Sequence, residues 1–242
     1  MRAAVVSDIH ANLHALEAVL ADIAAESVDE MWCLGDVVGY GPLPNECCAL
    51  VHEHATVALC GNHDLAAVGA LDIAEFSGDA AAAARWTASV LEPAHRDWLG
   101  SLAPEGERAG VELYHGSPRD PIWEYVLTEQ VALLGLLETE SQLVLVGHSH
   151  VALGVAWDGK TLAGGVAPAG TVLDLAAARH LANPGSVGQP RDGDARAAWL
   201  MVDTEAGKGT FRRVTYDVKR TQAEIRERGL PDILAARLAH GV

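Results

Sequence analysis

Five short polar clusters interrupt apolar stretches of this chain, and each carries side chains that can hold a metal ion or move a proton. The clusters are Asp8-Ile9-His10, Gly35-Asp36, Gly61-Asn62-His63-Asp64, His115-Gly116 and Gly147-His148-Ser149-His150. Mixed imidazole and carboxylate ligands suit divalent ions such as manganese, iron, cobalt, nickel and zinc. The candidates exceed the three or four ligands of one tetrahedral zinc site, so the set predicts two metals with one carboxylate bridging them. No cysteine belongs to the set, which argues against a structural zinc knot.

Each cluster also has a structural interpretation when it is taken alone. An aspartate such as Asp8 or Asp36 often caps a helix, and a lone histidine on a loop is commonly a core or surface residue. We interpret six other histidines in that way: His14, His52, His54, His95, His180 and His240. Among them, His52-Glu53-His54 lacks the spacing that places two histidines on one face of a zinc-protease helix. Capping does not explain five clusters that follow five apolar runs, so we interpret the set as functional.

The apolar runs before the clusters predict the strands that position them. We expect strands at residues 2–7, 30–34, 56–60, 111–114 and 142–146, and helices at 11–26, 44–53, 79–102 with a break at Pro93, and 128–138. Asn12 is the expected cap of the first helix. Strands that alternate with helices are typical of a largely parallel sheet. Because open α/β sheets bind ligands at the carboxyl ends of their strands, the five clusters are expected to meet there.

The pattern changes beyond residue 150. Short alternating strands are expected at 152–157, 171–175, 198–203 and 210–216, followed by a helix at 219–240 with a kink at 229–231. These strands predict a second, more antiparallel sheet. Because no repeat, linker or boundary is recognisable, we expect one domain over residues 1–242, an α/β fold with two sheets face to face and helices outside.

The composition narrows the class of protein. Half of the 242 residues are apolar, but no apolar run reaches the roughly 18 residues of a membrane helix, and the first residues indicate a strand rather than a signal peptide. The formal net charge of −16, without a basic stripe, disfavours long nucleic acids and anionic membranes as partners. We interpret Cys33, Cys47, Cys48 and Cys60, which form no Cys-x-x-Cys pair, as reduced and mostly buried thiols of a cytoplasmic protein.

The clusters, in their order, resemble the motifs of the calcineurin-like metallophosphoesterases. This resemblance covers about the first 150 residues and rests on Asp8-x-His10, Gly35-Asp36, Gly61-Asn62-His63-Asp64, His115 and Gly147-His148-x-His150. The stretches at 35–42 and 183–194 resemble the small bacterial and archaeal phosphodiesterases of the family, which extends the match through most of the chain. The resemblance implies a four-layer α/β/β/α sandwich, in agreement with the pattern of elements.

The resemblance also implies a role for each residue. One metal would take Asp8, His10, Asp36 and His150, and the second would take Asp36, Asn62, His115 and His148, with Asp36 as the bridge. His63 would stand beside the leaving-group oxygen rather than bind a metal. The chain departs from the protein-phosphatase branch at Gly39, where that branch has an aspartate that orients the catalytic histidine, and this departure disfavours phosphoprotein substrates. Asp64 is the candidate that would serve His63 instead.

We therefore expect a metal-dependent phosphodiesterase or phosphatase that hydrolyses small phosphoesters. Two dications neutralise the anionic phosphoester and lower the pKa of a bridging water, so that a nucleophile exists near neutral pH. Manganese is the expected metal, with iron, nickel, cobalt and zinc as alternatives. Arg191 is a candidate fork for a phosphate and Asn183 a candidate for lining the cleft, against the simpler interpretations of an exposed loop arginine and a turn between strands. Because ligand histidines must be neutral, metal affinity is expected to fall as the pH drops through the usual histidine pKa of about 6.5.

Two other functions compete with this one. A non-catalytic scaffold of the same fold, such as the retromer subunit, has a degraded site, whereas every expected ligand and His63 are present here. A nuclease for short oligonucleotides would need clustered lysines or arginines on the phosphate backbone, and the chain has no basic stripe. The residues leave open whether the substrate is a monoester, a diester, a cyclic nucleotide or a dinucleoside polyphosphate, and they leave the oligomeric state open.

Overall fold

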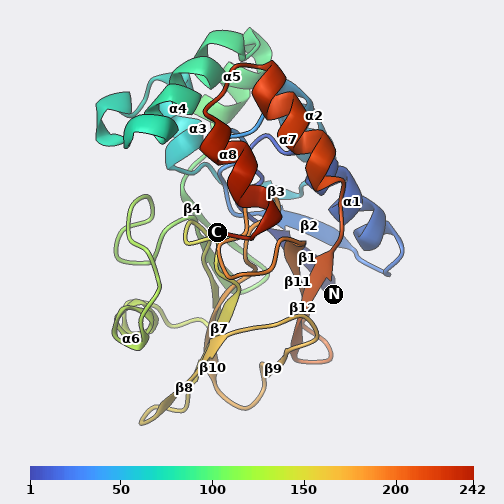
Figure 1. Ribbon diagram of the computed structural model, residues 1–242. Coiled ribbons are helices and arrows are strands. Elements are labelled where there is room, and N and C mark those ends of the chain that lie inside the picture. Colours follow the sequence, from blue (N-terminus) through green and yellow to red (C-terminus); the bar gives the residue numbers. More distant parts are fainter.

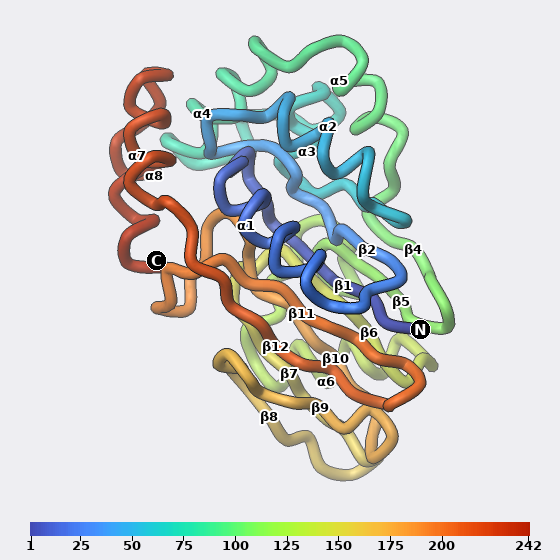
Figure 2. Tube along the Cα trace, turned by 90° about the vertical axis from the view of Figure 1, so that its right-hand side faces the viewer, coloured from blue at the N-terminus to red at the C-terminus, as the bar shows by residue number.

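The computed structural model describes residues 1–242 and contains two mixed sheets of six strands each (Figure 1). The first sheet has the order β3 (Val57–Ala58), β2 (Glu30–Cys33), β1 (Arg2–Val6), β11 (Ala197–Asp203), β12 (Lys208–Val214) and β9 (Val172–Asp174). Figure 2 shows this order from β2 to β9. The second has the order β4 (Glu105–Arg108), β5 (Val111–Tyr114), β6 (Leu143–Leu145), β10 (Arg179–Asn183), β7 (Leu153–Trp157) and β8 (Leu162–Val166).

Helices cover the outer faces of both sheets. Helices α1 (Leu13–Ala24), α2 (Pro44–His54) and α5 (Pro93–Gly100) pack on the first sheet, and α6 (Glu129–Leu137) packs on the second. The other helices are α3 (Asn62–Val68), α4 (Gly78–Val90), α7 (Val218–Glu227) and α8 (Asp232–Ala236), with 3-10 turns η1 (Ile73–Glu75) and η2 (Arg237–Ala239). They gather at the upper end of the molecule in Figure 1, whereas α6 stands apart at the lower left. The α/β/β/α sandwich expected from the sequence is confirmed. None of the helices combines the length and the apolar character needed to cross a membrane.

Strand β1 is a continuous apolar run because both of its faces are buried. Ala4 and Val6 pack in the core under α1 and α2, whereas Ala3 and Val5 pack between the two sheets. Side chains alternate across a strand, so a strand covered on both faces needs apolar residues at every position. The core between the sheets contains large side chains such as Trp32, each worth roughly 1.5–3 kcal/mol on burial. This rigid double layer carries the loops that follow its strands.

Several local predictions are confirmed. The strand at 111–114 has the expected bounds, and the Asn12 side chain accepts a hydrogen bond from the Ala15 amide at the start of α1. The expected break at Pro93 separates α4 from α5. All four cysteines are buried and unpaired.

The division of the later strands between the sheets differs from the expectation. Of the strands predicted after residue 150, only β7 belongs to the second sheet, whereas β9, β11 and β12 extend the first. The physical reason is the open edge of β1: β11 pairs antiparallel with it, with Val5 opposite Leu200. An alternating pattern predicts a strand but carries no information about its distant partner.

The helical and strand bounds near the first clusters also differ. The strand expected at 56–60 is only Val57–Ala58, and the residues after Gly61 begin α3, a helix that was not predicted. Strands β4 and β8 were not predicted because their sequences are rich in glycine or charge, and β10 was not predicted because it contains no β-branched residue. The closing helix is two helices, α7 and α8, separated at Gly229, which has φ +69°.

Candidate metal centre

The loops that follow the strands hold five expected ligands in the left-handed region of the backbone. These are Asp8 (φ 54°), His10 (φ 50°), Asp36 (φ 52°), His148 (φ 64°) and His150 (φ 59°). A residue other than glycine costs roughly 1–3 kcal/mol in such a conformation and persists where the surroundings impose it. Here backbone bonds between the loops impose it: the Asp8 amide donates to the Gly35 carbonyl at 3.0 Å and the His10 amide to the Asp36 carbonyl at 2.9 Å. These backbone conformations turn the side chains of the five ligands toward a common centre.

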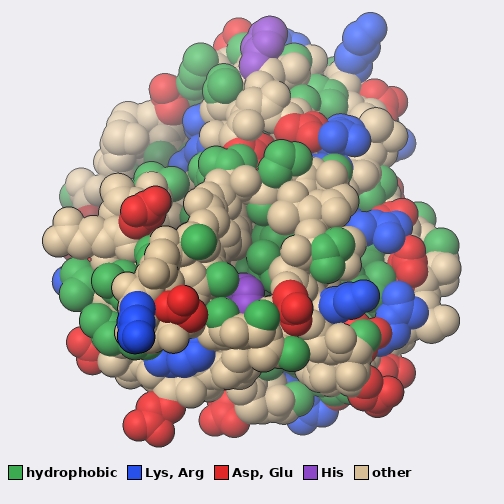
Figure 3. Space-filling model, turned by 90° about the horizontal axis from the view of Figure 1, so that it is seen from below, with side chains coloured by type: hydrophobic (Ala, Val, Ile, Leu, Met, Phe, Trp, Pro, Cys, Tyr) green, Lys and Arg blue, Asp and Glu red, His purple; other side chains and the backbone are tan.

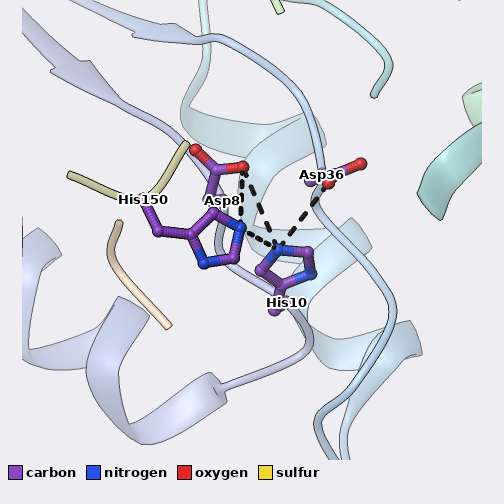
Figure 4. A group of neighbouring side chains, drawn as sticks. All are labelled: Asp8, His10, Asp36 and His150. Atoms are coloured by element: carbon purple, nitrogen blue, oxygen red, sulfur yellow. Dashed lines mark hydrogen bonds and ion pairs between the residues drawn. The ribbon is translucent and has the colours of Figure 1, made fainter. Parts of the chain in front are cut away.

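Asp8, His10, Asp36 and His150 form the first group of converging side chains (Figure 4). The Nε2 atoms of His10 and His150 lie 3.0 Å apart, and His150 Nε2 lies 3.4 Å from Asp8 Oδ1. His10 Nε2 also lies 3.7 Å from Asp36 Oδ2. The four candidate ligand atoms are all within 4.8 Å of one another.

Asp36, His115 and His148 form a second group that shares Asp36 with the first. His115 Nε2 lies 3.5 Å from Asp36 Oδ2 and 3.3 Å from the side-chain oxygen of Asn62. The same oxygen of Asp36 therefore faces both groups. All seven expected ligands lie in these two groups or beside them, in the arrangement that the resemblance implied, and all are between 0 and 4 % exposed.

Backbone carbonyls hold the ligand histidines with Nε2 turned inward. Nδ1 of His10 lies 3.1 Å from the Val38 carbonyl, Nδ1 of His115 lies 2.9 Å from that of Leu34, and Nδ1 of His150 lies 2.7 Å from that of Gln189. A ring that donates from Nδ1 leaves Nε2 as a lone pair, which is the usual support for a metal-ligating histidine. The 3.0 Å approach of the His10 and His150 Nε2 atoms then brings two lone pairs together with no hydrogen between them.

The buried atoms that lack partners fit divalent metal ions. Asp8 Oδ1, Asp36 Oδ2 and His148 Nε2 are buried without a hydrogen-bond partner. An unpaired buried polar atom costs roughly 1–3 kcal/mol, and more for a charged group. The other carboxylate oxygens are satisfied, because the His148 amide donates to Asp8 Oδ2 and the His63 amide to Asp36 Oδ1. The orphaned atoms are thus the ones that point at the shared space, and nitrogen with carboxylate oxygen is a donor set for borderline divalent ions.

Burial changes the charge of these ligands in the metal-free protein. Desolvation raises the pKa of Asp8 to about 7 and that of Asp36 well above its ordinary value. Desolvation also lowers the pKa of His148 to about 2 and holds the pKa values of His10 and His150 well below 6.5. These three histidines are therefore neutral and ready to bind a metal, whereas the carboxyl groups are the groups that must release protons.

Asp64 is not a partner of the His63 ring, which corrects the role expected for it. Its carboxylate accepts hydrogen bonds from the amides of Val37 (3.2 Å), Val38 (2.9 Å) and Gly61 (3.0 Å), and so ties the loop after β2 to the start of α3. Nδ1 of His63 is buried without any partner.

Gly39 lies against the His63 ring, as expected of the position where the two family branches differ. A Cβ at Gly39 would be 2.6 Å from His63 Nδ1, and Gly39 has φ +92°, so no larger residue fits while the ring keeps this place. The ring packs on Tyr40 at 4.3 Å and on Phe76 at 4.9 Å between centroids. Desolvation lowers its pKa to about 3, so His63 is neutral at pH 7 in the metal-free protein.

Asn183 does not line a cleft. Its side chain is 0 % exposed, donates to the Gly147 carbonyl at 2.6 Å and to Ser149 Oγ at 3.0 Å, and accepts from the Gly185 amide at 2.8 Å. It therefore positions the loop that carries His148 and His150, and its own polar atoms are not free for a substrate.

Arg191 lies beside the two groups of candidate ligands. Some of the residues around it were not predicted from the sequence to belong to the site. Its guanidinium carbon is 5.8 Å from the Tyr40 ring centroid, and it forms no ion pair. It shares Gln189 Oε1 with Arg237, at 2.7 Å and 3.1 Å respectively. The signal for Arg191 in the sequence was its place in a loop rich in glycine and proline, whereas Arg237, on η2, follows no motif.

The fold and this site define a metallophosphoesterase-like architecture. The chain belongs to the calcineurin-like phosphoesterase superfamily, whose domain matches residues 1–207. It is 36 % identical over 243 residues to an uncharacterised protein of Methanocaldococcus jannaschii, covering 98 % of this chain and 97 % of that one. The crystal structure of a metallophosphoesterase from Sphaerobacter thermophilus is similar over 100 % of both chains, with 44 % identity and a TM-score of 0.90. A hypothetical protein from Pyrococcus horikoshii shares the fold over 100 % of this chain and 98 % of its own, with a TM-score of 0.81 and 22 % identity.

Proposed function

We propose that this protein is a phosphoesterase that uses two divalent metal ions to hydrolyse small phosphoesters, either monoesters or diesters. The observation that carries the proposal is the buried, unpartnered Asp36 Oδ2, which faces both groups of ligands, with His10 Nε2 at 3.7 Å and His115 Nε2 at 3.5 Å. Asp8, His10, Asp36 and His150 would hold one ion, and Asp36, Asn62, His115 and His148 the other. Ions in these places would neutralise phosphate oxygens and supply a nucleophile by lowering the pKa of water.

The other residues of the site would act on the substrate directly. His63 is placed among aromatic rings with an unpartnered Nδ1, and a neutral imidazole donates a hydrogen bond where charge develops on a leaving oxygen. Arg191 carries a guanidinium without a carboxylate partner and would bind a phosphate oxygen. We propose manganese as the metal, with iron, nickel, cobalt and zinc as alternatives.

The charge of the molecule favours small substrates over long nucleic acids. The net charge is −16, and the face in Figure 3 carries acidic and basic side chains interspersed rather than a basic stripe. A non-catalytic scaffold is disfavoured because orphaned buried carboxylates and strained backbone are costly features that a binding surface does not need.

The experiment is a panel of phosphoesters assayed with metal-free protein to which Mn, Ni, Co, Zn or Mg is returned, with metal content measured by elemental analysis. We expect about two ions per chain, loss of hydrolysis after chelation and recovery with Mn. Asp36→Asn is expected to lower both metal content and activity more than Asp8→Asn, because only Asp36 faces both groups. Full activity after thorough chelation would contradict the proposal.

A further inference from the structure

Tyr125 presents an aromatic face to solvent beside the candidate metal centre. Tyr125 is 45 % exposed, although the next residue, Val126, is buried. The other face of the ring lies flat on the His148 imidazole, with centroids 4.0 Å apart and an angle of 5° between the planes. A tyrosine that served only as packing would be buried, whereas this one is exposed and covers the imidazole of a ligand histidine.

The segment that carries Tyr125 is held rigidly by its own hydrogen bonds. Asp120 Oδ1 accepts from the amides of Ile122 (3.1 Å) and Trp123 (3.0 Å), and Ser117 Oγ donates to Glu124 at 2.5 Å. These bonds fix the backbone just before Tyr125, and the stacking on His148 orients its ring, so less entropy is lost when a flat ligand binds to it.

Two further aromatic rings lie beside the candidate metal centre. Trp123 packs on Phe76 with centroids 5.6 Å apart, and Phe76 in turn contacts the His63 ring at 4.9 Å. Phe76 and Trp123 are half-buried and come from two different connections, so they meet only in the folded chain. Apolar aromatic side chains thus adjoin the candidate metal centre, where the proposed function places a phosphate.

We infer that Tyr125 is a stacking platform for the planar base of a nucleotide substrate. The inference rests on the proposed function, because it takes the phosphate of the same substrate to lie at the metal centre. A nucleotide joins in one molecule the two chemistries that the site offers, an anionic phosphate and a flat π system. Stacking of a base on an aromatic side chain is worth roughly a 5- to 100-fold change in affinity and tolerates different bases.

The test compares two ligands that differ only in the base. Hydrolysis of adenosine 5′-phosphate and of ribose 5-phosphate releases a primary 5-hydroxyl in both cases, on adenosine or on ribose, so their ratio of kcat/KM in the Mn-loaded protein measures recognition of the base. The diester pair is thymidine 5′-p-nitrophenyl phosphate against methyl p-nitrophenyl phosphate. Binding of both sugar phosphates is also measured by calorimetry, which does not depend on turnover. We expect the nucleotide to be favoured roughly 5- to 100-fold in both measurements.

Three variants separate stacking from support of the metal centre. Tyr125→Leu should abolish the preference for the nucleotide, and Tyr125→Phe, which keeps the aromatic face, should retain it. The control is Trp98→Leu, because Trp98 also stacks on a histidine, His52, with centroids 5.1 Å apart, but on α5 away from the centre. Metal content is measured for each variant, and Tyr125→Phe and Trp98→Leu should leave the ratio unchanged.

The outcomes distinguish this inference from the proposed function. Equal binding and cleavage of the two sugar phosphates, with hydrolysis intact, would overturn the stacking platform and leave the phosphoesterase standing. Loss of the preference in Tyr125→Phe as well would assign the effect to the hydroxyl and likewise overturn stacking. If no phosphoester is hydrolysed, the proposed function fails, and the calorimetric comparison still decides whether the base is bound.

Discussion

The buried carboxyl of Asp8, a candidate metal ligand, makes the stability of the metal-free protein depend on pH. Burial raises its pKa to about 7 from an ordinary value of 3.8. A carboxyl whose pKa is raised on folding contributes its full stability below the unfolded pKa and loses it as the pH rises through the folded pKa. The metal-free protein should therefore become less stable between about pH 4 and pH 8, by up to roughly 4 kcal/mol from this group alone.

Asp8→Asn tests this coupling. The amide keeps an oxygen for the His148 amide but carries no charge, so without metal the variant should be more stable than the wild type at pH 8, and the two should converge near pH 4. With Mn present the order should reverse, because the variant has lost a charged ligand. Urea unfolding at both pH values, with and without chelator, measures the difference. A variant that is less stable than the wild type under all four conditions would show that Asp8 acts through packing.

In the proposed reaction, His63 acts at the leaving group, whereas the ligands act through the metals. As a neutral hydrogen-bond donor, it helps most where the leaving oxygen develops the most charge. His63→Ala should keep both metals and lose roughly 10²–10⁴-fold on alkyl or nucleoside esters. The loss on nitrophenyl esters should be clearly smaller, because nitrophenolate leaves readily without help.

Kinetics on matched alkyl and nitrophenyl esters, together with metal analysis, decide the role of His63. Equal losses on both esters with unchanged metal would mean that His63 stabilises the phosphoryl group instead. A parallel loss of metal would make it a ligand.

The loop after β2 and helix α3 are joined by one carboxylate. Asp64 stands at the third position of α3 and accepts three backbone amides, two of them from the loop that carries Asp36. Since Asp36 and Asn62 flank this connection, the register of the second group of ligands depends on it. The side chain that caps α3 thus also holds in place the loop that carries a candidate metal ligand.

Asp64→Ala should destabilise the protein by roughly 2–4 kcal/mol, because it leaves buried amides unpaired, and should lower metal affinity. The control is Asp158→Ala, since Asp158 also accepts two backbone amides, at 2.8 Å each, but in an exposed turn. Thermal unfolding and metal titration of both variants compare them. Unchanged metal affinity in Asp64→Ala would show that the hydrogen bonds of Asp64 do not position the metal ligands.

Both sheets contribute residues to the candidate metal centre. Each group of ligands combines residues that follow β1, β2 or β3 of the first sheet with residues that follow β5 or β6 of the second. Ions bound there would cross-link the sandwich. At free metal about 100 times the dissociation constant, one site adds about 2.7 kcal/mol, or roughly 5–10 °C for a chain of this size.

Addition of Mn should therefore raise the unfolding temperature by at least this amount in a single transition, followed by calorimetry. His150→Ala should reduce the shift, because it removes the second sheet's ligand from the first group, whereas His54→Ala, on the exposed end of α2, should leave it unchanged. Two separate transitions, with only one responding to Mn, would contradict cross-linking.

The pH dependence of metal binding also belongs to the whole molecule, because the packing of both sheets buries the ligands. The sequence predicted competition by protons at the histidines, but burial holds the pKa values of His10 and His150 far below 6.5 and raises that of Asp8 to about 7. Affinity should still fall as the pH drops through about 7, with protons released from carboxyl groups. Calorimetry of Mn binding in buffers of different ionisation enthalpy counts them. More protons should be released at pH 6 than at pH 8.5, and a constant count would contradict this assignment.

The sequence by itself determined the candidate ligands, their order and the strands before them. These are local properties: an apolar run predicts a strand, and the polar residues that follow it, such as Asp8 after β1, lie at its carboxyl end whatever the rest of the chain does. The pairing of β11 with β1, the three amides on Asp64 and the Tyr125 ring over His148 were decided only by the tertiary structure. Each of these joins segments that are distant in the sequence, and side-chain type and periodicity carry no information about which distant segment will supply the partner.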